Sequence, residues 1–279
     1  MNPKVNHLLS KATLFRCPLC HNSLEPRGSS LICKNNHTFN VAKKGHVNFV
    51  PGQKPLKYTQ ELFLARGRVF DQGFYAPALE KIHTIIETYQ KEQNLSSLNI
   101  VDVGCGQGYY SKVLASNPNH TVIGFDLSTD AIALAASGAH QALFMVADLT
   151  NIPLADESQD IILDILTQAN YKEFQRILKP DGLIIKVIPG EEYLIEIRRL
   201  LAGSIQKDNH SDQSVIQHFQ AHHKLKETTG THYTLPVDSN QAMDFLQMTP
   251  MTLHVDLDKI PRQELKQVTL DLKILIGTN

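Results

Sequence analysis

The chain has 279 residues, of which 42% are hydrophobic, and this is enough for a full α/β core with a small additional module. Its net charge of −1 conceals a division along the chain. The first 57 residues contain nine Lys or Arg and a single acid, Glu25, whereas the remainder holds 18 of the 27 basic and 27 of the 28 acidic residues. The sequence therefore predicts that the N-terminal part contacts a polyanion; charge kept on a small module for solubility is the alternative.

No apolar run approaches the roughly 20 residues that a membrane-spanning helix needs. The N-terminal residues MNPKVNHLLSKATLF lack an apolar segment followed by a small-residue cleavage site, so no secretory signal is predicted. Four cysteines, three of them within 17 residues, are too few for a disulfide framework. We therefore expect a cytoplasmic protein that does not act at a membrane, with clustered cysteines that bind metal.

The clustered cysteines follow the pattern Cys17-x2-Cys20-x12-Cys33-x3-His37 within a Cys/His-rich, loop-like region, residues 13–50. A C-x2-C pair places two thiolates on one side of a metal ion, and a second pair completes a tetrahedron. Because four protein ligands leave no open coordination position, the pattern predicts a structural Zn²⁺ on which a module of this size depends for folding. A redox-active Cys17/Cys20 pair, with Cys33 and His37 incidental, is the alternative.

The chain divides into a zinc-binding module at 1–50, a linker and helical segment at 51–97, and an α/β domain at 98–279. In the second region Pro51 to Lys57 form the linker, and apolar residues then recur at helical spacing, interrupted at Gly73 and Pro77. Residues 204–223 are polar and His-rich and are expected to form an insertion or a mobile loop.

From Leu98 onward, strands and helices alternate. The central strands are continuously apolar, which is typical of parallel strands buried on both faces, and the helices between them are expected to begin near Tyr109, Ser128 and Tyr171. Two strands with a helix between them follow near the C-terminus. This order predicts a doubly wound, mostly parallel sheet with an antiparallel edge. The expected strands are 98–103, 121–125, 142–147, 160–166, 183–188, 228–235 and 267–276, and the last helix is 239–246.

A glycine-rich loop, Asp102-x-Gly104-x-Gly106-x-Gly108, follows the first of these strands and opens a helix. Glycines allow a tight turn and a close approach of ligand to backbone, and the helix N-terminus offers unpaired N–H groups. A dinucleotide-binding loop has the spacing G-x-G-x-x-G, and here the third glycine comes one residue too early. The loop has instead an acid, Asp102, two residues before its first glycine, and this suits a ligand with an ammonium group.

Two further acids end the second and third of these strands. Asp126 can accept hydrogen bonds from both hydroxyls of a ribose, and Asp148 can accept one from an adenine amino group. Leu149, directly after Asp148, is expected to contact the cofactor as well. Because the carboxyl ends of neighbouring parallel strands share one crevice, the three acids predict an adenosyl ligand there. In the alternative interpretation each acid caps a helix or begins a turn; their order beside the glycine loop favours the ligand.

Residues 98–189 resemble the class I methyltransferases, which have a Rossmann-like fold and use S-adenosylmethionine. The resemblance rests on the glycine loop, on the three acids and on Leu178-Lys179-Pro180-Asp181-Gly182, which is similar to the L-K-P-G-G turn of that family. Cys105, inside the loop, is interpreted as a small packing residue and not as a nucleophile.

The combination of the zinc module with this loop resembles the RlmA/TlrB-type 23S ribosomal RNA (guanine-N1)-methyltransferases over essentially the whole chain. The resemblance implies that Tyr75 and Tyr193 line the cofactor pocket together with Gly106 and Gln107. It implies a guanine in a 23S ribosomal RNA hairpin as substrate, and it is compatible with a homodimer. Matching residues include Cys17-Pro18-Leu19-Cys20, residues 37–48, Ala65-Arg66, residues 102–110 and residues 246–250.

Two features bear on the substrate. Lysines of the first 57 residues are expected to bind RNA phosphates, with His21 and His46 as further surface candidates. After the fourth strand, Leu166-Thr167-Gln168 stands where the family has an aromatic residue, a small residue and Pro. The lysines are Lys34, Lys43, Lys44, Lys54 and Lys57.

No general base is identified from the sequence, and Asp164, within an apolar strand, is either a candidate or a structural residue. Two other functions stay open. One is a small-molecule methyltransferase with a structural zinc lobe. The other is a non-catalytic, zinc-dependent RNA-binding protein that retains the cofactor site.

Overall fold

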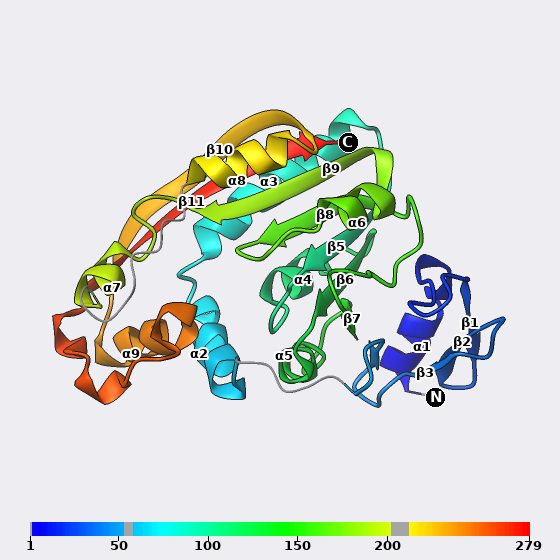
Figure 1. Ribbon diagram of the computed structural model, residues 1–279, viewed down its shortest axis with the longest axis horizontal. Helices are drawn as coiled ribbons and strands as arrows, with labels where there is room; N and C mark the ends of the chain where they lie inside the picture. Colours follow the sequence, from blue (N-terminus) through cyan, green and yellow to red (C-terminus); the bar gives the residue numbers. More distant parts are fainter. Residues whose placement is uncertain (1, 53–57, 202–211) are drawn as a thin grey trace.

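The computed structural model describes residues 2–52, 58–201 and 212–279. An eight-stranded sheet with the order β10-β11-β9-β8-β5-β6-β7-β4 runs through the molecule (Figure 1). From β9 to β4 all neighbouring strands are parallel, whereas β11 pairs antiparallel with both β9 and β10. The predicted doubly wound, mostly parallel sheet with an antiparallel edge is therefore confirmed. Its strands are β4 (His46–Asn48), β5 (Leu98–Val103), β6 (His120–Asp126), β7 (Leu143–Val146), β8 (Gln159–Ile165), β9 (Leu178–Pro189), β10 (Lys224–Pro236) and β11 (Gln267–Thr278).

Successive residues of the central strands belong to two different apolar cores, because neighbouring side chains of a strand point to opposite faces. Ile100 of β5 packs in a core that includes residues of α3, α4, α5, α7 and α9. Val101 packs in a second core, with residues of α6, α8 and the N-terminal module. Both faces are thus covered, which explains the continuously apolar strands. These helices are α3 (Ala76–Glu92), α4 (Tyr109–Leu114), α5 (Thr129–Ala135), α6 (Tyr171–Ile177), α7 (Ile195–Leu200), α8 (Asp212–Gln220) and α9 (Ser239–Met248).

The N-terminal residues fold into more regular structure than the predicted loop. They form α1 (Pro3–Leu9), the 3-10 helix η1 (Ala12–Leu14) and an antiparallel sheet of β1 (Leu24–Arg27), β2 (Ser30–Cys33) and β3 (Thr38–Asn40). Residues 46–48 then form β4, at the edge of the main sheet and parallel to β7. These strands have only three or four residues each, so they show no apolar periodicity in the sequence.

The N-terminal module is fastened to the main sheet by both apolar and polar contacts. Phe15 pairs with Leu154 in an isolated bridge, and buried residues of the module share one core with the sheet. Arg16 forms an ion pair with Asp156 at 3.1 Å. The Asn151 side-chain amide donates to the carbonyl of Pro18 at 2.8 Å, which ties the first metal-ligand pair to the loop that follows β7. The module therefore has a fixed position relative to the carboxyl ends of the strands.

The helical segment predicted within residues 51–97 lies beside the carboxyl ends of the strands (Figure 1). α2 (Gln60–Asp71) and α3 are separated by a turn at Gly73, which has φ +80°, and Pro77 lies in the first turn of α3, as predicted. α2 packs against α9, and the 3-10 helices η2 (Pro250–Thr252), η3 (Leu257–Lys259) and η4 (Arg262–Glu264) follow α9 (Figure 1). Of the predicted loop 204–223, residues 204–211 lie outside the described residues. Residues 212–220 form α8 instead, and its Phe219 is buried.

Candidate cofactor site and metal centre

The glycine loop connects β5 to α4 in a conformation that its glycines require. Gly104, Gly106 and Gly108 have φ values of +63°, +55° and +77°. A Cβ atom on Gly104 would lie 2.6 Å from Oγ1 of Thr167, and one on Gly108 would lie 2.6 Å from the ring of Phe144. Larger residues would therefore be strained and would also collide with the segment after β8 and with β7. The loop is held tightly at the carboxyl ends of the strands.

Asp102 lies beneath this loop and is almost fully buried, at 2% exposure. Its Oδ2 accepts a hydrogen bond from the Ser111 hydroxyl at 2.5 Å. Burial raises the pKa of Asp102 to about 7, the Ser111 hydrogen bonds oppose the rise, and the charges of Asp126 and Asp164 add to it. A carboxyl group in this position gains its charge readily only when a cation comes close, as the predicted ammonium group would.

Asp126 is the last residue of β6, as predicted, and Asp148 lies two residues after the end of β7. Asp126 accepts from the N–H of Gly106 at 3.0 Å and from that of Ser128 at 2.8 Å, so it also fixes the glycine loop. Asp148 accepts from the N–H and the hydroxyl of Thr150, both at 2.8 Å. Both acids therefore make the turn contacts of the alternative interpretation. Because each carboxylate oxygen has two lone pairs, these contacts are compatible with a ligand as well.

Leu149 follows Asp148 and is half-buried. Its carbonyl accepts from the side-chain amide of Asn170 at 3.2 Å, which joins the loop after β7 to the loop after β8. Its predicted contact with the cofactor stays a prediction.

On the other side of the glycine loop, aromatic side chains from distant segments converge. The hydroxyls of Tyr75 and Tyr193 are 2.6 Å apart, so these two residues, 118 positions apart, meet as the resemblance implies. Tyr75 is 1% exposed. Within the described part of the chain, the hydroxyl of Tyr110 and both amide atoms of Gln107 are buried and have no hydrogen-bond partner. Unpartnered buried polar atoms are rare, and here they fit a polar ligand such as the amino-acid end of S-adenosylmethionine.

The segment after β8 departs from the family and has a supporting contact that no local pattern marks. Leu166 is left-handed, with φ +53°, and 38% exposed. The ammonium of Lys186, on β9, donates to Oδ2 of Asp164 at 2.6 Å and to the carbonyl of Thr167 at 3.2 Å. Asp164 is fully buried, and burial raises its pKa to about 6 although Lys186 opposes the rise. A fully buried carboxylate held in an ion pair is a structural group, which favours the second interpretation of Asp164.

The four predicted metal ligands converge. The Sγ atoms of Cys17 and Cys33 each lie 3.4 Å from Nδ1 of His37, and Sγ of Cys20 lies 3.6 Å from that of Cys33. All four ligand atoms lie within 4.8 Å of one another. Zn–S bonds of about 2.3 Å in a tetrahedron separate sulfur atoms by roughly 3.8 Å, so this donor set fits Zn²⁺. Because His37 lies beside Cys17 and Cys33 lies beside Cys20, all four side chains face one another, which disfavours the redox interpretation.

The basic residues of the module are not all free to bind a polyanion. Lys34, Lys43 and Lys44 are exposed. The ammonium of Lys44 lies 3.3 Å from the carbonyl of Ala133, in the last turn of α5. Lys54 and Lys57 lie outside the described residues. Of the two histidines, His21 is exposed, whereas His46 is half-buried in β4 and burial lowers its pKa, so His46 is not a surface residue.

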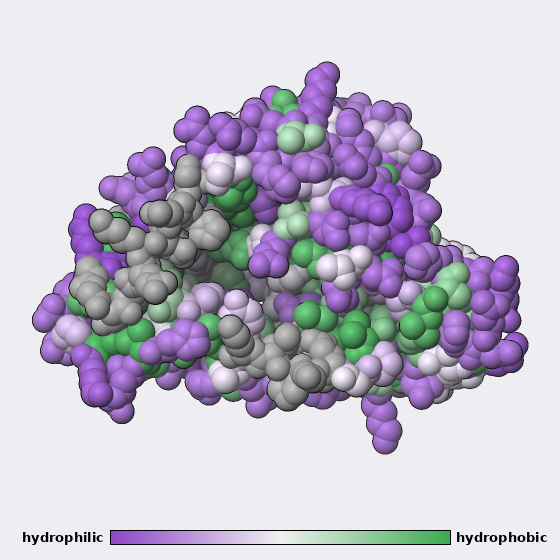
Figure 2. Space-filling view, viewed as in Figure 1, coloured by the Kyte–Doolittle hydropathy of each residue, from purple (hydrophilic) through white to green (hydrophobic). Residues whose placement is uncertain are grey.

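The face seen in Figure 2 is hollowed beyond the carboxyl ends of β8 and β9, and apolar residues are visible in the hollow. Where described residues border the hollow, many of them are polar. Within the described residues, no helix combines the length and the apolar character needed to cross a membrane.

Two family models match separate parts of the chain. One, described as a methyltransferase domain, covers residues 100–182, and the other, described as the N-terminal part of RlmA, covers residues 15–56. Together with the sheet order, the first match identifies the class I methyltransferase fold. The second coincides with the metal centre and is named a zinc ribbon.

Relatives match the chain over nearly its whole length. YxjB of Bacillus subtilis, provisionally named a 23S rRNA (guanine-N1)-methyltransferase, is 33% identical over 95% of this chain and 97% of its own. The 23S rRNA (guanine(748)-N(1))-methyltransferase of Streptomyces fradiae is 28% identical over 89% of each chain. Among solved structures, the YcgJ protein of Bacillus subtilis aligns with a TM-score of 0.48 at 19% identity, covering 71% of this chain and 98% of its own. The zinc ribbon, the methyltransferase domain and the full-length relatives show that this chain belongs to the RlmA-type family of 23S rRNA (guanine-N1)-methyltransferases.

Proposed function

We propose that the protein transfers a methyl group from S-adenosylmethionine to N1 of a guanine in a hairpin of 23S ribosomal RNA. The observation that carries this proposal is the fixed position of the zinc module next to the loops that surround the glycine loop, through the contact between Asn151 and Pro18. A rigid basic module beside a cofactor crevice suits a large polyanionic substrate. Full-length relatives that bear this activity in their names support the same substrate.

The residues of the crevice have separate tasks in this proposal. S-adenosylmethionine, when bound, would supply a methyl group on a sulfonium that leaves as the thioether, so alignment accounts for much of the rate. The proton that N1 carries is released to water as the methyl group is transferred. Asp102 provides negative charge for the ammonium group. Asp126 accepts hydrogen bonds from the ribose hydroxyls. Gly104 and Gly106 keep side chains out of the space above the loop. Asp148 and Leu149 border the adenine.

The acceptor side is formed by the segment after β8. A guanine must leave its stack to expose N1, and a hairpin loop makes this less costly than a duplex does. Leu166 presents an apolar side chain there, and Lys186 fixes the backbone of the next residue through the carbonyl of Thr167. We propose that this rigid segment aligns N1 with the methyl group, while Lys34 and Lys43 contact phosphates.

The test uses ribosomal RNA from cells that lack the protein. Incubation with purified protein and S-adenosylmethionine should produce one methylated guanine that blocks primer extension, because N1 lies on the pairing edge of the base. RNA methylated beforehand in cells that contain the protein is the control and should accept no further methyl group. If every guanine stays unmodified, the proposal is wrong.

Two further measurements separate the alternatives. Salt-sensitive RNA binding without methyl transfer would indicate the non-catalytic RNA-binding protein, and turnover on a metabolite without RNA binding would indicate a small-molecule methyltransferase. Light scattering tests the homodimer, which should have twice the 31.2 kDa mass of one chain.

A further inference from the structure

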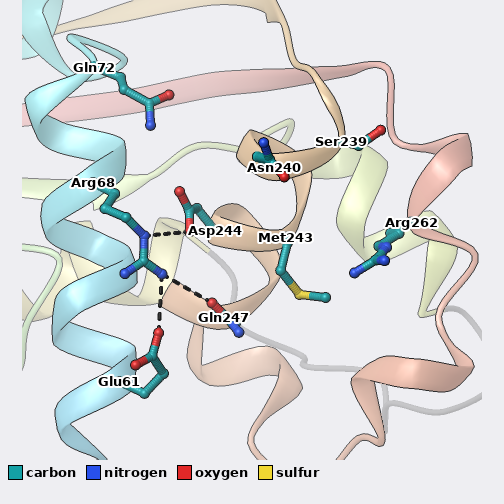
Figure 3. Close-up of a pocket in the computed structure, with 9 residues that line it drawn as sticks. All are labelled: Glu61, Arg68, Gln72, Ser239, Asn240, Met243, Asp244, Gln247 and Arg262. Carbon is teal, nitrogen blue, oxygen red and sulfur yellow. Dashed lines mark hydrogen bonds and ion pairs between the residues drawn. The ribbon is translucent and has the colours of Figure 1, made fainter.

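Helix α2 has two arginines that differ in their partners. The guanidinium of Arg68 has three side-chain acceptors. It donates to Asp244 at 2.8 Å, to Glu61 at 3.1 Å and to Gln247 at 3.3 Å. These residues line a polar cavity of about 520 Å³ between α2 and α9 (Figure 3). Arg66 lies two residues earlier, about 160° away around the helix from Arg68. Its role is therefore separate from that of Arg68.

The guanidinium of Arg66 is half-buried and has no acidic partner. Its Nη2 donates to the carbonyl of Met248, at the end of α9, at 3.0 Å, and its Cζ lies 5.8 Å from the centre of the Phe63 ring. Across the described ranges of the chain, no carboxylate lies within ion-pair distance of it. A guanidinium has five N–H donors, so the contact with Met248 leaves most of them available.

Arg66 points toward the cofactor loop. A Cβ atom placed on Gly106 would lie 3.8 Å from Nη1 of Arg66. The positive charge of Arg66 also lowers the pKa of Asp126 and those of the hydroxyls of Tyr75 and Tyr193, against the larger opposite effect of burial. The guanidinium therefore lies beside the glycine loop, and its charge acts on Asp126 and on the tyrosine pair.

The charges of the predicted ligand require a cation in this position. S-adenosylmethionine carries a sulfonium, an ammonium and a carboxylate group. Asp102 matches the ammonium group and Asp126 the ribose hydroxyls, but no residue that has been given a role from the sequence matches the carboxylate. Arginine binds a carboxylate through two parallel N–H···O bonds, and a partly buried pair of this kind is strong.

We propose that Arg66 binds the carboxylate of S-adenosylmethionine, and that Met248 and Phe63 hold its guanidinium in place for this. The proposal rests on the proposed cofactor pocket and adds the residue that distinguishes the amino-acid end of the ligand from its nucleoside end. It also makes α2 and the end of α9 part of the cofactor site, which explains why residues 246–250 are among those that resemble the family.

The test compares two ligands that differ in the amino-acid end. S-adenosylhomocysteine has the carboxylate, whereas 5′-methylthioadenosine lacks the whole amino-acid group. Their dissociation constants are measured by calorimetry, without RNA, on the full chain and on the variants Arg66→Met, Arg66→Lys and Arg68→Met. We expect Arg66→Met to weaken S-adenosylhomocysteine ten- to a hundredfold and 5′-methylthioadenosine less than twofold. Arg66→Lys should lie between, because it keeps the charge without the paired geometry.

The control Arg68→Met alters the same helix but not the proposed cofactor pocket. Any change in the dissociation constant should therefore be equal for the two ligands. If Arg66→Met weakens both ligands equally, Arg66 has only a structural role and the proposal is overturned. It is also overturned if neither ligand is affected. Failure of the unsubstituted chain to bind either ligand would instead refute the proposed cofactor pocket, and the role of Arg66 with it.

Discussion

The zinc centre and the cofactor pocket lie in the same molecule but use their polar groups in opposite ways. At the zinc centre the ligand atoms face one another, and Asn22 additionally donates to Cys20 at 3.2 Å. In the proposed cofactor pocket, among the described residues, Gln107 and Tyr110 have buried polar atoms without partners, and Asp102 is buried without a cation beside it. One metal ion completes the first site, and the bound ion stabilises the fold. The second costs stability until a ligand fills it.

The largest expected effect comes from removing a zinc ligand, with Cys33→Ser. Structural zinc sites contribute about 10–16 kcal/mol of apparent binding energy, and the module shares an apolar core with the sheet, so the loss should unfold the whole chain and not the module alone. Circular dichroism melts and the zinc content of the purified protein measure this. Cys105→Ser removes a cysteine outside the cluster and should keep one zinc ion per chain. If the Cys33→Ser protein keeps the melting temperature of the unsubstituted chain, the zinc centre does not stabilise the fold as expected.

The next effect concerns the buried ion pair of Asp164 and Lys186, which supports the segment after β8. Asp164→Ala leaves a buried ammonium group without its partner, and breaking a buried pair in this way costs about 3–5 kcal/mol. Urea denaturation measures the loss. The double variant Asp164→Ala/Lys186→Met should recover much of it, because neither charge is then left alone. If the double variant is less stable than Asp164→Ala, the pair is not the reason for the loss.

The two regions also differ in how far the sequence predicts them. The zinc ligands could be found because their spacing is local, and the strands because parallel strands covered on both faces are continuously apolar. β4 was missed because His46-Val47-Asn48 has one apolar residue and joins the sheet only through β7, about 100 positions away. Lys186 has no local signal either, since its pairing with Asp164 depends on the register of β8 and β9.

Within the pocket, the acids that end strands could be placed from the sequence because topology brings strand ends together. The contacts of Asp126 with Gly106 and of Asp102 with Ser111 needed the folded loop. The same holds for the lysines: Lys43 and Lys44 are equivalent in the sequence, but only the structure shows that Lys44 reaches α5. Tyr75 and Tyr193 were predicted only from the resemblance to the family, because no local spacing links residues that are 118 positions apart.

A smaller effect appears in the pH dependence of the apo protein. The pKa of Asp102 is about 7 when folded, against an ordinary value of 3.8, so the folded state binds this proton more tightly. The stability that the protonated group provides is therefore present below about pH 4 and is lost as the pH rises through about 7. Asp102→Asn should remove this part of the decline, as measured by urea unfolding from pH 4 to pH 8. Ser111→Ala removes a hydrogen bond that lowers the pKa, so it should move the decline to higher pH. If the free energy of unfolding of the Asp102→Asn protein falls with rising pH as steeply as that of the unsubstituted chain, groups other than Asp102 cause the fall.

The smallest effect separates two neighbouring lysines on the surface of the zinc module. Lys43 is exposed, so Lys43→Ala should remove one phosphate contact and reduce the slope of log K against log salt for hairpin RNA by about 1. Lys44 is exposed too, but its ammonium donates to the carbonyl of Ala133 at the end of α5, so Lys44→Ala should cost up to about 1 kcal/mol of stability and reduce the slope less than Lys43→Ala does. Fluorescence anisotropy at several salt concentrations measures the slopes, and thermal melts measure the stability. Equal slopes for the two variants would mean that the contact between Lys44 and α5 does not decide which of the module's lysines meet RNA.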